Sequence, residues 1–203
     1  MKTLILARHA HAASNAGDVV NAVPPGGGLS AAGIEEARAL GRLLALEAID
    51  LGVSSRLLRA RETLVLALGD QAAPLVTEPL LDEIGFGSFE GGPLDAYRAW
   101  AWEHDADAAC PGGGESRAGA ASRLAEGLGS LLARPEQTVL AVSHGLPVRY
   151  VLDAAEGRLP ARRVEPVAHA RPYRLERESV ELAAETLRAW AAEPRFTDTP
   201  FGG

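Results

Sequence analysis

The chain has 203 residues, a length typical of one domain that buries a sizeable core without disulfide or metal support. Apolar residues make up 47% and charged residues 23% of the sequence, which excludes an intrinsically disordered chain. The net charge of −7 argues against a nucleic-acid-binding or anionic-membrane surface protein. We therefore expect one domain over residues 1–203, with neither nucleic acid nor a membrane as partner.

Cysteine usage and the first residues bear on compartment. Cys110 is the only cysteine, so an intrachain disulfide framework and a cysteine zinc cluster are both excluded. The apolar run at the start is interrupted by Arg8 and His9, which makes it too short for a signal peptide or a membrane span. These features predict a cytoplasmic protein.

Strands and helices alternate along the chain. The hydrophobic spacing, with Gly, Pro and capping residues as boundaries, predicts in order a strand over 3–7, a helix from Ser30 to Leu44, a strand over 49–54, a helix over 57–68, a strand over 74–77, helices over 94–104 and 116–133, a strand over 137–142, a helix with Pro147 in its first turn, strands over 164–168 and 173–176, and a helix over 180–191. The segments 10–29 and 82–93 are predicted to be loops. This alternation predicts an α/β fold, a three-layer α/β/α sandwich around a mostly parallel central sheet.

Two of the predicted strands end in the same kind of residue. The strand over 3–7 is followed by Arg8 and His9, and the strand over 137–142 is followed by Ser143, His144 and Gly145. Ligands of parallel α/β sheets bind beyond the carboxyl ends of the strands. An arginine fork matches phosphate oxygens, and a neutral imidazole can act as a nucleophile. The pattern therefore indicates a site for an anionic group near both histidines.

Five motifs in this order resemble the histidine phosphatase superfamily, also called the phosphoglycerate-mutase-like family. They cover about residues 3–150 and are Arg8-His9-Ala10 with Asn15, Leu29-Ser30-Ala31-Ala32-Gly33, the segment 54–63 (SSRLLRARET), the segment 81–91 (LDEIGFGSFEG), and Gly114-Glu115-Ser116 followed by Val142-Ser143-His144-Gly145.

The resemblance implies a metal-independent phosphatase that hydrolyses phosphate monoesters through a phosphohistidine. His9 would be the nucleophile. Arg8, Arg59 and His144 would line the phosphate pocket, beside Gly145, and Asn15 would contact phosphate or substrate near the rim. Glu83 would be the general acid and then the base. No cofactor and no metal are implied, the partner is a small phosphorylated substrate, and a homodimer is an expectation from the family alone.

Several neighbouring residues leave alternatives open. Asp82 and Glu90 compete with Glu83 for the role of the acid. Glu115 and Ser116 either contact substrate or only cap a helix. Tyr97, Trp100 and Trp102 either form a wall of the substrate pocket or pack in the core, and we expect packing. The segment 93–112 is where we expect substrate choice to be decided, and no role is assigned to His104 or His169.

The sequence departs from the family pattern directly after His9. Ala10 replaces the usual glycine, which costs little if φ is negative there. His11 replaces a frequent glutamate, and we expect it to face water. Ala12 replaces a hydroxyl residue, which weakens a mutase interpretation.

Three other functions compete with the phosphatase. A phosphoglycerate mutase of the cofactor-dependent kind has a longer insertion than the short segment between Glu83 and Glu115. A metal hydrolase built on His9, His11 and His144 would need a larger barrel than this chain offers. A non-catalytic domain that binds phosphorylated ligands is disfavoured because Arg8, His9, Arg59, Glu83 and His144 are all present.

Overall fold

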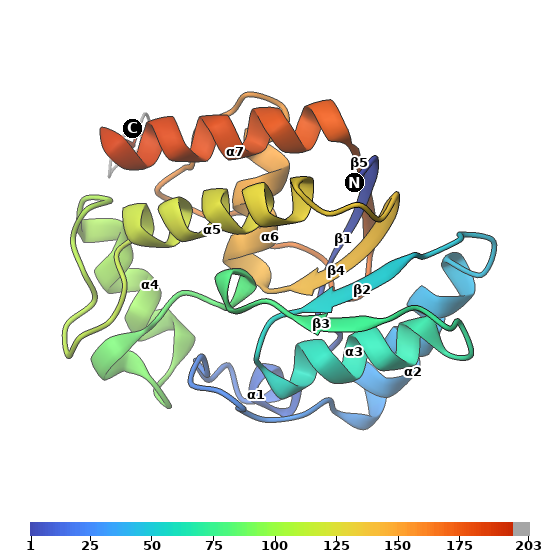
Figure 1. Ribbon diagram of the computed structural model, residues 1–203. Coiled ribbons are helices and arrows are strands. Elements are labelled where there is room, and N and C mark those ends of the chain that lie inside the picture. The colour runs from blue at the N-terminus through green and yellow to red at the C-terminus, as the bar shows by residue number, and fades with distance from the viewer. Residues whose placement is uncertain (197–203) are drawn as a thin grey trace.

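The computed structural model describes residues 1–196 and contains one five-stranded sheet with helices on both faces (Figure 1). The strands are β1 (Thr3–Arg8), β2 (Leu51–Ser54), β3 (Leu75–Thr77), β4 (Thr138–Ser143) and β5 (Pro172–Glu176). The helices are α1 (Ala13–Ala16), α2 (Ala31–Leu43), α3 (Leu58–Leu68), α4 (Leu94–Glu103), α5 (Arg117–Leu132), α6 (Gly145–Ala154) and α7 (Arg177–Ala192), with 3₁₀ turns η1 (Pro79–Leu81) and η2 (Gly87–Phe89).

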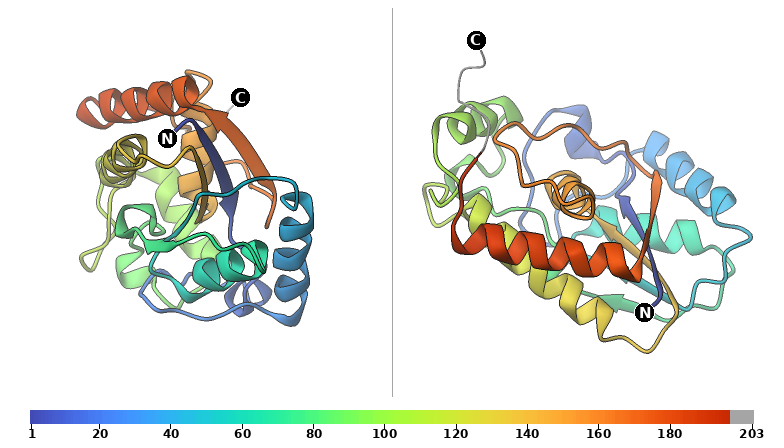
Figure 2. Two further views of the ribbon diagram at one scale, coloured as in Figure 1. Left: turned by 45° about the vertical axis from the view of Figure 1, so that its right-hand side comes forward. Right: turned by 90° about the horizontal axis from the view of Figure 1, so that it is seen from above.

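The sheet has the strand order β3-β2-β4-β1-β5. Neighbouring strands are parallel except β5, which runs antiparallel to β1. The predicted α/β/α sandwich with a mostly parallel sheet is therefore confirmed. Helices α5, α6 and α7 cover one face, α2 and α3 cover the other, and α5 lies alongside α7 (Figure 2).

Both faces of the central strands are buried, which explains their continuous apolar runs. In β1, Leu4 and Leu6 pack toward α5 and α7, whereas Ile5 and Ala7 pack toward α2 and α3. Alternate side chains of a strand point to opposite faces, so one apolar run supplies two cores. This rigid double packing fixes the point at which β1 ends.

Helix boundaries follow the capping residues that the sequence contains. Ser30 caps α2 by accepting a hydrogen bond from the amide of Gly33 at 3.1 Å, and Ser116 caps α5 in the same way through Gly119 at 2.9 Å. Pro147 lies in the first turn of α6, where its missing N–H costs nothing.

One predicted strand is wrong. Residues 164–168 form no strand, and the only bridge near them joins Arg8 to His169. Both edges of β1 are already paired, with β4 and with β5, so the segment cannot pair with β1. Pro166 also lacks the N–H that a ladder requires. The short helix α1 lies within a segment that was predicted to be entirely loop.

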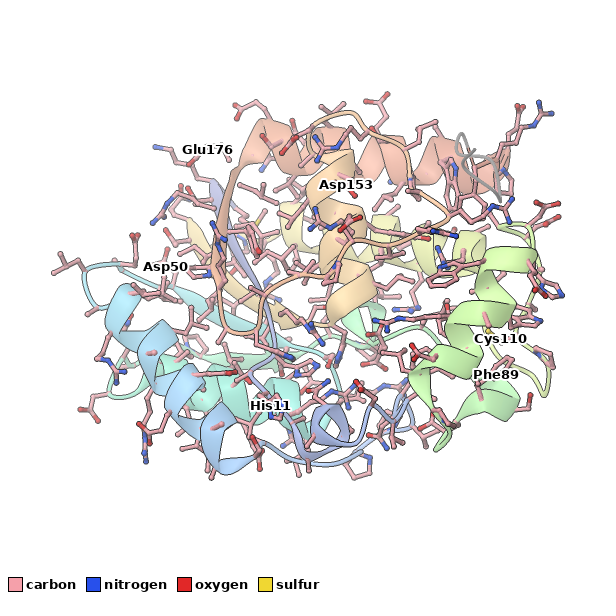
Figure 3. All side chains as sticks on the ribbon, turned by 180° about the vertical axis from the view of Figure 1, so that it is seen from behind. His11, Asp50, Phe89, Cys110, Asp153 and Glu176 are labelled. Carbon is pink, nitrogen blue, oxygen red and sulfur yellow. The ribbon has the colours of Figure 1, made fainter. Side chains whose placement is uncertain are left out.

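The carboxyl ends of the parallel strands face the region of α4. In a view from behind, Phe89 and Cys110 lie beside α4, at the opposite end of the molecule from Asp50, which precedes β2 (Figure 3). The loops after β1, β2 and β4 therefore meet at one end of the sheet.

Candidate active site

The two strand-terminal histidines lie next to each other because β1 and β4 are adjacent and parallel. Arg8 pairs with Ser143 in the register, and the amide of His9 donates to the carbonyl of Ser143 at 2.9 Å. The next residues along both strands are His9 and His144, whose ring centroids are 5.1 Å apart. The meeting of these two side chains, expected from the strand ends, is confirmed.

Arg59 on α3 connects the two rings. Its Nε donates to Nε2 of His9 at 3.1 Å, and its Nη2 lies 3.2 Å from Nδ1 of His144. The same guanidinium donates to the backbone carbonyl of Asn21 at 2.8 Å and to the Asn21 side chain at 3.3 Å. Thr63, one turn further along α3, accepts from the amide of Ala10 at 2.9 Å. Helix α3 is thereby fixed to the loop that follows β1.

The hydrogen bonds define the protonation of both rings. Nδ1 of His9 lies 2.7 Å from the carbonyl of Ala10, which only accepts, so this nitrogen carries the proton and Nε2 presents a lone pair. Nδ1 of His144 accepts from Arg59, and its Nε2 lies 2.7 Å from Oγ of Ser55. Burial, followed by the positive charge of Arg59, holds the pKa of both histidines well below the ordinary value. Both imidazoles are therefore neutral at pH 7.

Arg8 presents an unused donor to the same space. Its Nη1 donates to the carbonyl of Val167 at 2.8 Å, but its buried Nε has no hydrogen-bond partner within residues 1–196. In that range neither Arg8 nor Arg59 forms an ion pair with a carboxylate. Two buried guanidinium groups without counter-ions are costly, and an anionic ligand would neutralise them. Gly145 lies against Arg8, since a Cβ there would be 3.6 Å from Nε.

Glu83 is the acid that faces this cluster. Its Oε1 accepts from the amide of Ile84 at 3.0 Å, and burial raises the pKa of the carboxyl despite the charges of Arg59 and Arg8. The two competing acids are used elsewhere. Asp82 pairs with Arg56 at 2.7 Å, and Glu90 accepts from the amide of Ala22 at 2.9 Å. The geometry therefore favours Glu83 over both.

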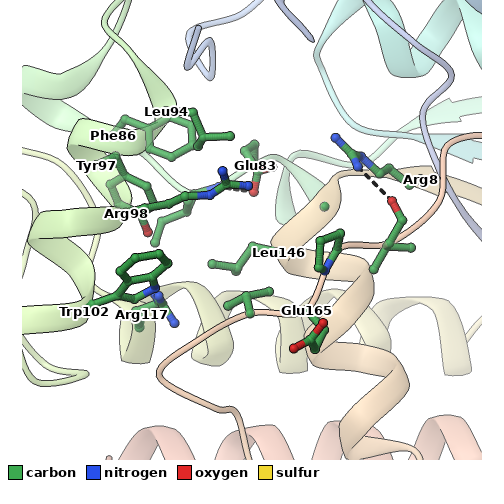
Figure 4. Close-up of a pocket in the computed structure, with 15 residues that line it drawn as sticks. Arg8, Glu83, Phe86, Leu94, Tyr97, Arg98, Trp102, Arg117, Leu146 and Glu165 are labelled. Carbon is green, nitrogen blue, oxygen red and sulfur yellow. Dashed lines mark hydrogen bonds between the residues drawn. The ribbon is translucent and has the colours of Figure 1, made fainter. Parts of the chain in front are cut away.

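A cavity of about 160 Å³ opens beside Arg8 and Glu83 (Figure 4). Most of its wall is apolar or aromatic and comes from the segments 84–102 and 146–167. The apolar and aromatic side chains include Phe86, Leu94, Tyr97, Trp102, Leu146 and Val167. Arg98, Arg117 and Glu165 add charged groups to the lining. Tyr97 is buried and also lines the cavity, so it packs in the core and forms part of the pocket wall at the same time. Trp100 does not line it and stacks on His104, with centroids 4.5 Å apart.

Other predicted residues lie outside the cluster or have different partners. Oδ1 of Asn15 accepts from the amide of Ala12 at 2.9 Å, and within residues 1–196 no hydrogen bond joins Asn15 to the two histidines or two arginines. His11 does not simply face water, because its Nδ1 lies 2.8 Å from Oγ of Ser30. Ala10 is not among the residues with positive φ, so the loss of glycine causes no strain there.

Three contributors were not found from the sequence. His169 contacts the backbone carbonyl of His9 through Nδ1 at 2.8 Å, and its ring centroid is 5.5 Å from that of His9. Asn21 and the carbonyl of Val167 hold Arg59 and Arg8. Asn21 and Val167 lie in segments without a motif. Val167 contacts Arg8 through its backbone carbonyl, which residue type does not reveal, and Asn21 contacts Arg59 through both its carbonyl and its side chain. A histidine three residues before the antiparallel strand was a usable signal for His169.

Two general properties complete the description. Residues 1–196 contain no group of three or more His, Cys, Asp and Glu side chains arranged to hold a metal ion. Over the same range no helix combines the length and the apolar character needed to cross a bilayer.

The sheet order and the helices on both faces give the phosphoglycerate-mutase-like α/β fold that similar solved structures share. A family model described as the histidine phosphatase superfamily (branch 1) matches residues 4–190, and the chain belongs to this superfamily. No match to a curated protein is found.

Three solved structures illustrate the similarity. The α-ribazole phosphatase from Shigella flexneri is 28% identical, with a TM-score of 0.73 over 85% of this chain and 89% of that chain. YhfR from Bacillus stearothermophilus is 25% identical, with a TM-score of 0.76 over 86% and 90%. A mycobacterial glucosyl-3-phosphoglycerate phosphatase is 25% identical, with a TM-score of 0.70 over 85% and 89%.

Proposed function

We propose that the protein hydrolyses phosphate monoesters through a phosphohistidine formed on Nε2 of His9. The observation that carries this proposal is the buried, unpartnered Nε of Arg8 in a cluster that also holds Arg59 without a counter-ion. A phosphoryl group has the charge and the acceptor oxygens to pair with both guanidinium groups. The phosphatase names of the similar structures support the same reaction class.

In the first step, the lone pair of Nε2 of His9 attacks phosphorus and the bond from phosphorus to the leaving oxygen breaks. Arg8 and Arg59 balance the charge on the other phosphoryl oxygens, which is the main requirement of phosphoryl transfer, and the neutral ring of His144 holds Arg59 in place. The hydrogen bond from Nε of Arg59 to Nε2 of His9 has to break when substrate binds, because the phosphorus atom approaches the same lone pair. The neutral state of His9 provides the required lone pair without a base.

Glu83 supplies the proton that an alkoxide leaving group needs. Its raised pKa keeps a proton on the carboxyl at higher pH than an exposed glutamate would, and the carboxyl lines the cavity next to Arg8. In the second step, the carboxylate takes a proton from water, whose oxygen attacks phosphorus and breaks the bond to Nε2. Inorganic phosphate leaves, and His9 and the protonated Glu83 are restored.

The cavity beside these groups accepts the leaving group. Its wall of Phe86, Leu94, Tyr97 and Leu146 favours the burial of an apolar or ring-shaped alcohol rather than a highly polar one. We therefore propose that an ester with such a group on its oxygen is turned over faster than glycerol phosphate.

The experiment that tests the function is hydrolysis of p-nitrophenyl phosphate in excess EDTA, with mass detection of a phosphorylated His9 peptide after rapid alkaline quench and under conditions that avoid acid, because phosphohistidine is acid-labile. We expect turnover and a phosphohistidine in the wild type, and neither in His9→Ala. His104→Ala is the matched control, because among residues 1–196 the ring of His104 contacts only Trp100, through a hydrogen bond to its carbonyl and through stacking. Activity that persists in His9→Ala, or that requires an added divalent metal, would refute the proposal.

A further inference from the structure

One arginine on α5 holds the backbone on which Glu83 lies. Nη1 of Arg123 donates to the carbonyls of Leu80 at 2.9 Å and of Asp82 at 3.0 Å, and Nη2 donates to the carbonyl of Glu83 at 3.4 Å. Residues 82–86 belong to neither a helix nor a strand, so regular structure does not fix them. A single side chain therefore supplies hydrogen bonds that a helix or sheet would otherwise provide.

Glu115 holds this arginine and the following residue of the loop together. Its carboxylate binds Arg123 in a two-point contact, with Nε to Oε1 at 2.9 Å and Nη2 to Oε2 at 2.8 Å. Oε2 also accepts from the amide of Gly85 at 3.3 Å, and the amide of Glu115 donates to the carbonyl of Gly85 at 2.8 Å. Only about a fifth of either side chain is exposed, with values of 20% and 23%, so the pair is rigid and weakly screened.

Neither Arg123 nor Glu115 lines the cavity beside Arg8. They line a second cavity, of about 440 Å³, together with Glu83 itself, Arg56 and Asp82. The side chain of Glu83 is thus flanked by a cavity on each side. Leu81 and Ile84 anchor the loop in the core on either side of Glu83. The hydrogen bonds of Arg123 and Glu115 fix the backbone groups that these apolar side chains leave unpaired.

We infer that Arg123, held by Glu115, is a positioning residue that fixes the distance from the Glu83 carboxyl to the leaving oxygen of a substrate bound at Arg8 and His9. This inference rests on the proposed function. Neither residue touches the phosphoryl cluster, so their effect passes through the backbone of residues 80–85. Proton transfer needs a contact of about 2.6–3.2 Å, and a small displacement of the loop would remove it.

Arg123 also acts on Glu83 through its charge. Together with Arg59 and Arg8 it lowers the pKa of a carboxyl that burial raises. The charged side chains that surround Glu83 come from several elements, namely Arg8 of β1, Arg56 before α3, Arg59 of α3, Asp82 of the same loop, Arg98 of α4, Glu115 before α5 and Arg123 of α5. Removing the Arg123 charge should move the Glu83 titration to higher pH, whereas lysine should leave it nearly in place.

The test compares kcat/KM for p-nitrophenyl phosphate, a good leaving group, with that for glycerol 2-phosphate, a poor one. Steps up to phosphorylation of His9 determine kcat/KM, and only the poor leaving group needs the proton of Glu83. General acid catalysis typically contributes 10²–10⁴-fold, so we expect Arg123→Met to lose about 10- to 100-fold on glycerol 2-phosphate and under about 3-fold on the aryl ester. Arg123→Met should also move the high-pH limb upward, and Arg123→Lys should lower the alkyl rate without that shift.

A double mutant sharpens the test. In a Glu83→Gln background there is no acid to position, so Arg123→Met should cause no further loss on glycerol 2-phosphate. Arg134→Met is the matched control, because Arg134 makes a comparable two-point contact with Glu136, at 2.9 and 3.2 Å, away from the site. Glu115→Gln removes the charge but keeps the shape, and it should reproduce the leaving-group pattern even if Arg123→Met fails to fold.

The outcomes separate this inference from the proposed function. A wild type that forms no phosphohistidine overturns the proposed function. If the wild type forms it but Arg123→Met and Glu115→Gln lower both esters equally, or the losses add fully in the Glu83→Gln background, the positioning role is refuted.

Discussion

Replacing Gly145 with alanine tests whether the unpartnered nitrogen of Arg8 is a phosphate donor. A Cβ at this position would lie 3.6 Å from Nε and 3.7 Å from Cζ of Arg8, with no other atom within 4 Å among its nearest neighbours. These are ordinary van der Waals distances, so the fold should tolerate the methyl group. The methyl would, however, occupy space beside the donor that a phosphoryl oxygen needs. The backbone N–H of residue 145 is kept.

The expected magnitude follows from the loss of one hydrogen bond to a charged group. Such a bond contributes about 1.5–3 kcal/mol, which corresponds to about 10- to 150-fold in affinity. We therefore expect Gly145→Ala to weaken inorganic phosphate binding by this factor in isothermal titration calorimetry. Stability should not fall, because position 145 is the first residue of α6 and alanine is a better helix former than glycine.

Gly129→Ala is the matched control, since a Cβ there would meet no atom within 4 Å and the residue also lies in a helix, α5. It should leave phosphate binding unchanged. Wild-type affinity in Gly145→Ala would refute the assignment of Arg8 Nε as a phosphate donor. A large drop in Tm would show instead that the methyl disturbs the fold.

Three further predictions concern the titrating groups of the site. The pKa of His9 is lowered and that of Glu83 is raised, so kcat/KM for an alkyl phosphate should fall at low pH as His9 gains a proton and at high pH as Glu83 loses one. The fall at high pH should be absent for p-nitrophenyl phosphate. Its presence with that ester would contradict the role of Glu83 as the acid. Because the pKa values of His9 and His144 are lowered in the folded state, the unfolded chain binds protons first as pH falls below about 6.5, and the free energy of unfolding in urea should drop by about 1–2 kcal/mol from pH 6.5 to 5.5. The measurement is made in Glu83→Gln, which removes the opposing contribution of that acid. A free energy that does not change with pH would contradict the lowered pKa values. His169→Phe removes the contact at 2.8 Å to the carbonyl of His9 and should lower kcat by about 10-fold with little change in KM, because a small displacement of the nucleophile slows its attack. An unchanged kcat would show that His169 does not orient His9.

The sequence predicted the fold well where one signal determined the outcome. The apolar run of residues 3–7 can be buried on both faces only in a covered sheet, and Ser30 and Ser116 mark their helices by capping. The predicted strand over 164–168 was wrong because its apolar residues suit a strand, whereas both sides of β1 are already taken. One of these two places is occupied by β5, which lies further along the chain.

The candidate site was predictable to the extent that residue type and strand order determine it. His9 and His144 follow neighbouring parallel strands, so the topology alone brings them together. The backbone partners of Arg8 and Arg59, the carbonyls of Val167 and Asn21, were not predictable, because every residue type offers a carbonyl. The choice of Glu83 over its neighbours similarly depended on which acids were already paired.

The cavity wall and the charged cluster come from different parts of the chain. The cluster depends on the ends of β1 and β4 and on α3, whereas Phe86, Leu94 and Trp102 belong to α4 and to the segment that precedes it. If the proposed function holds, substitutions in the wall change which leaving group is accepted while the charged cluster stays in place. A gene duplicate of this scaffold could then acquire a new substrate through changes in the two wall segments, 84–102 and 146–167.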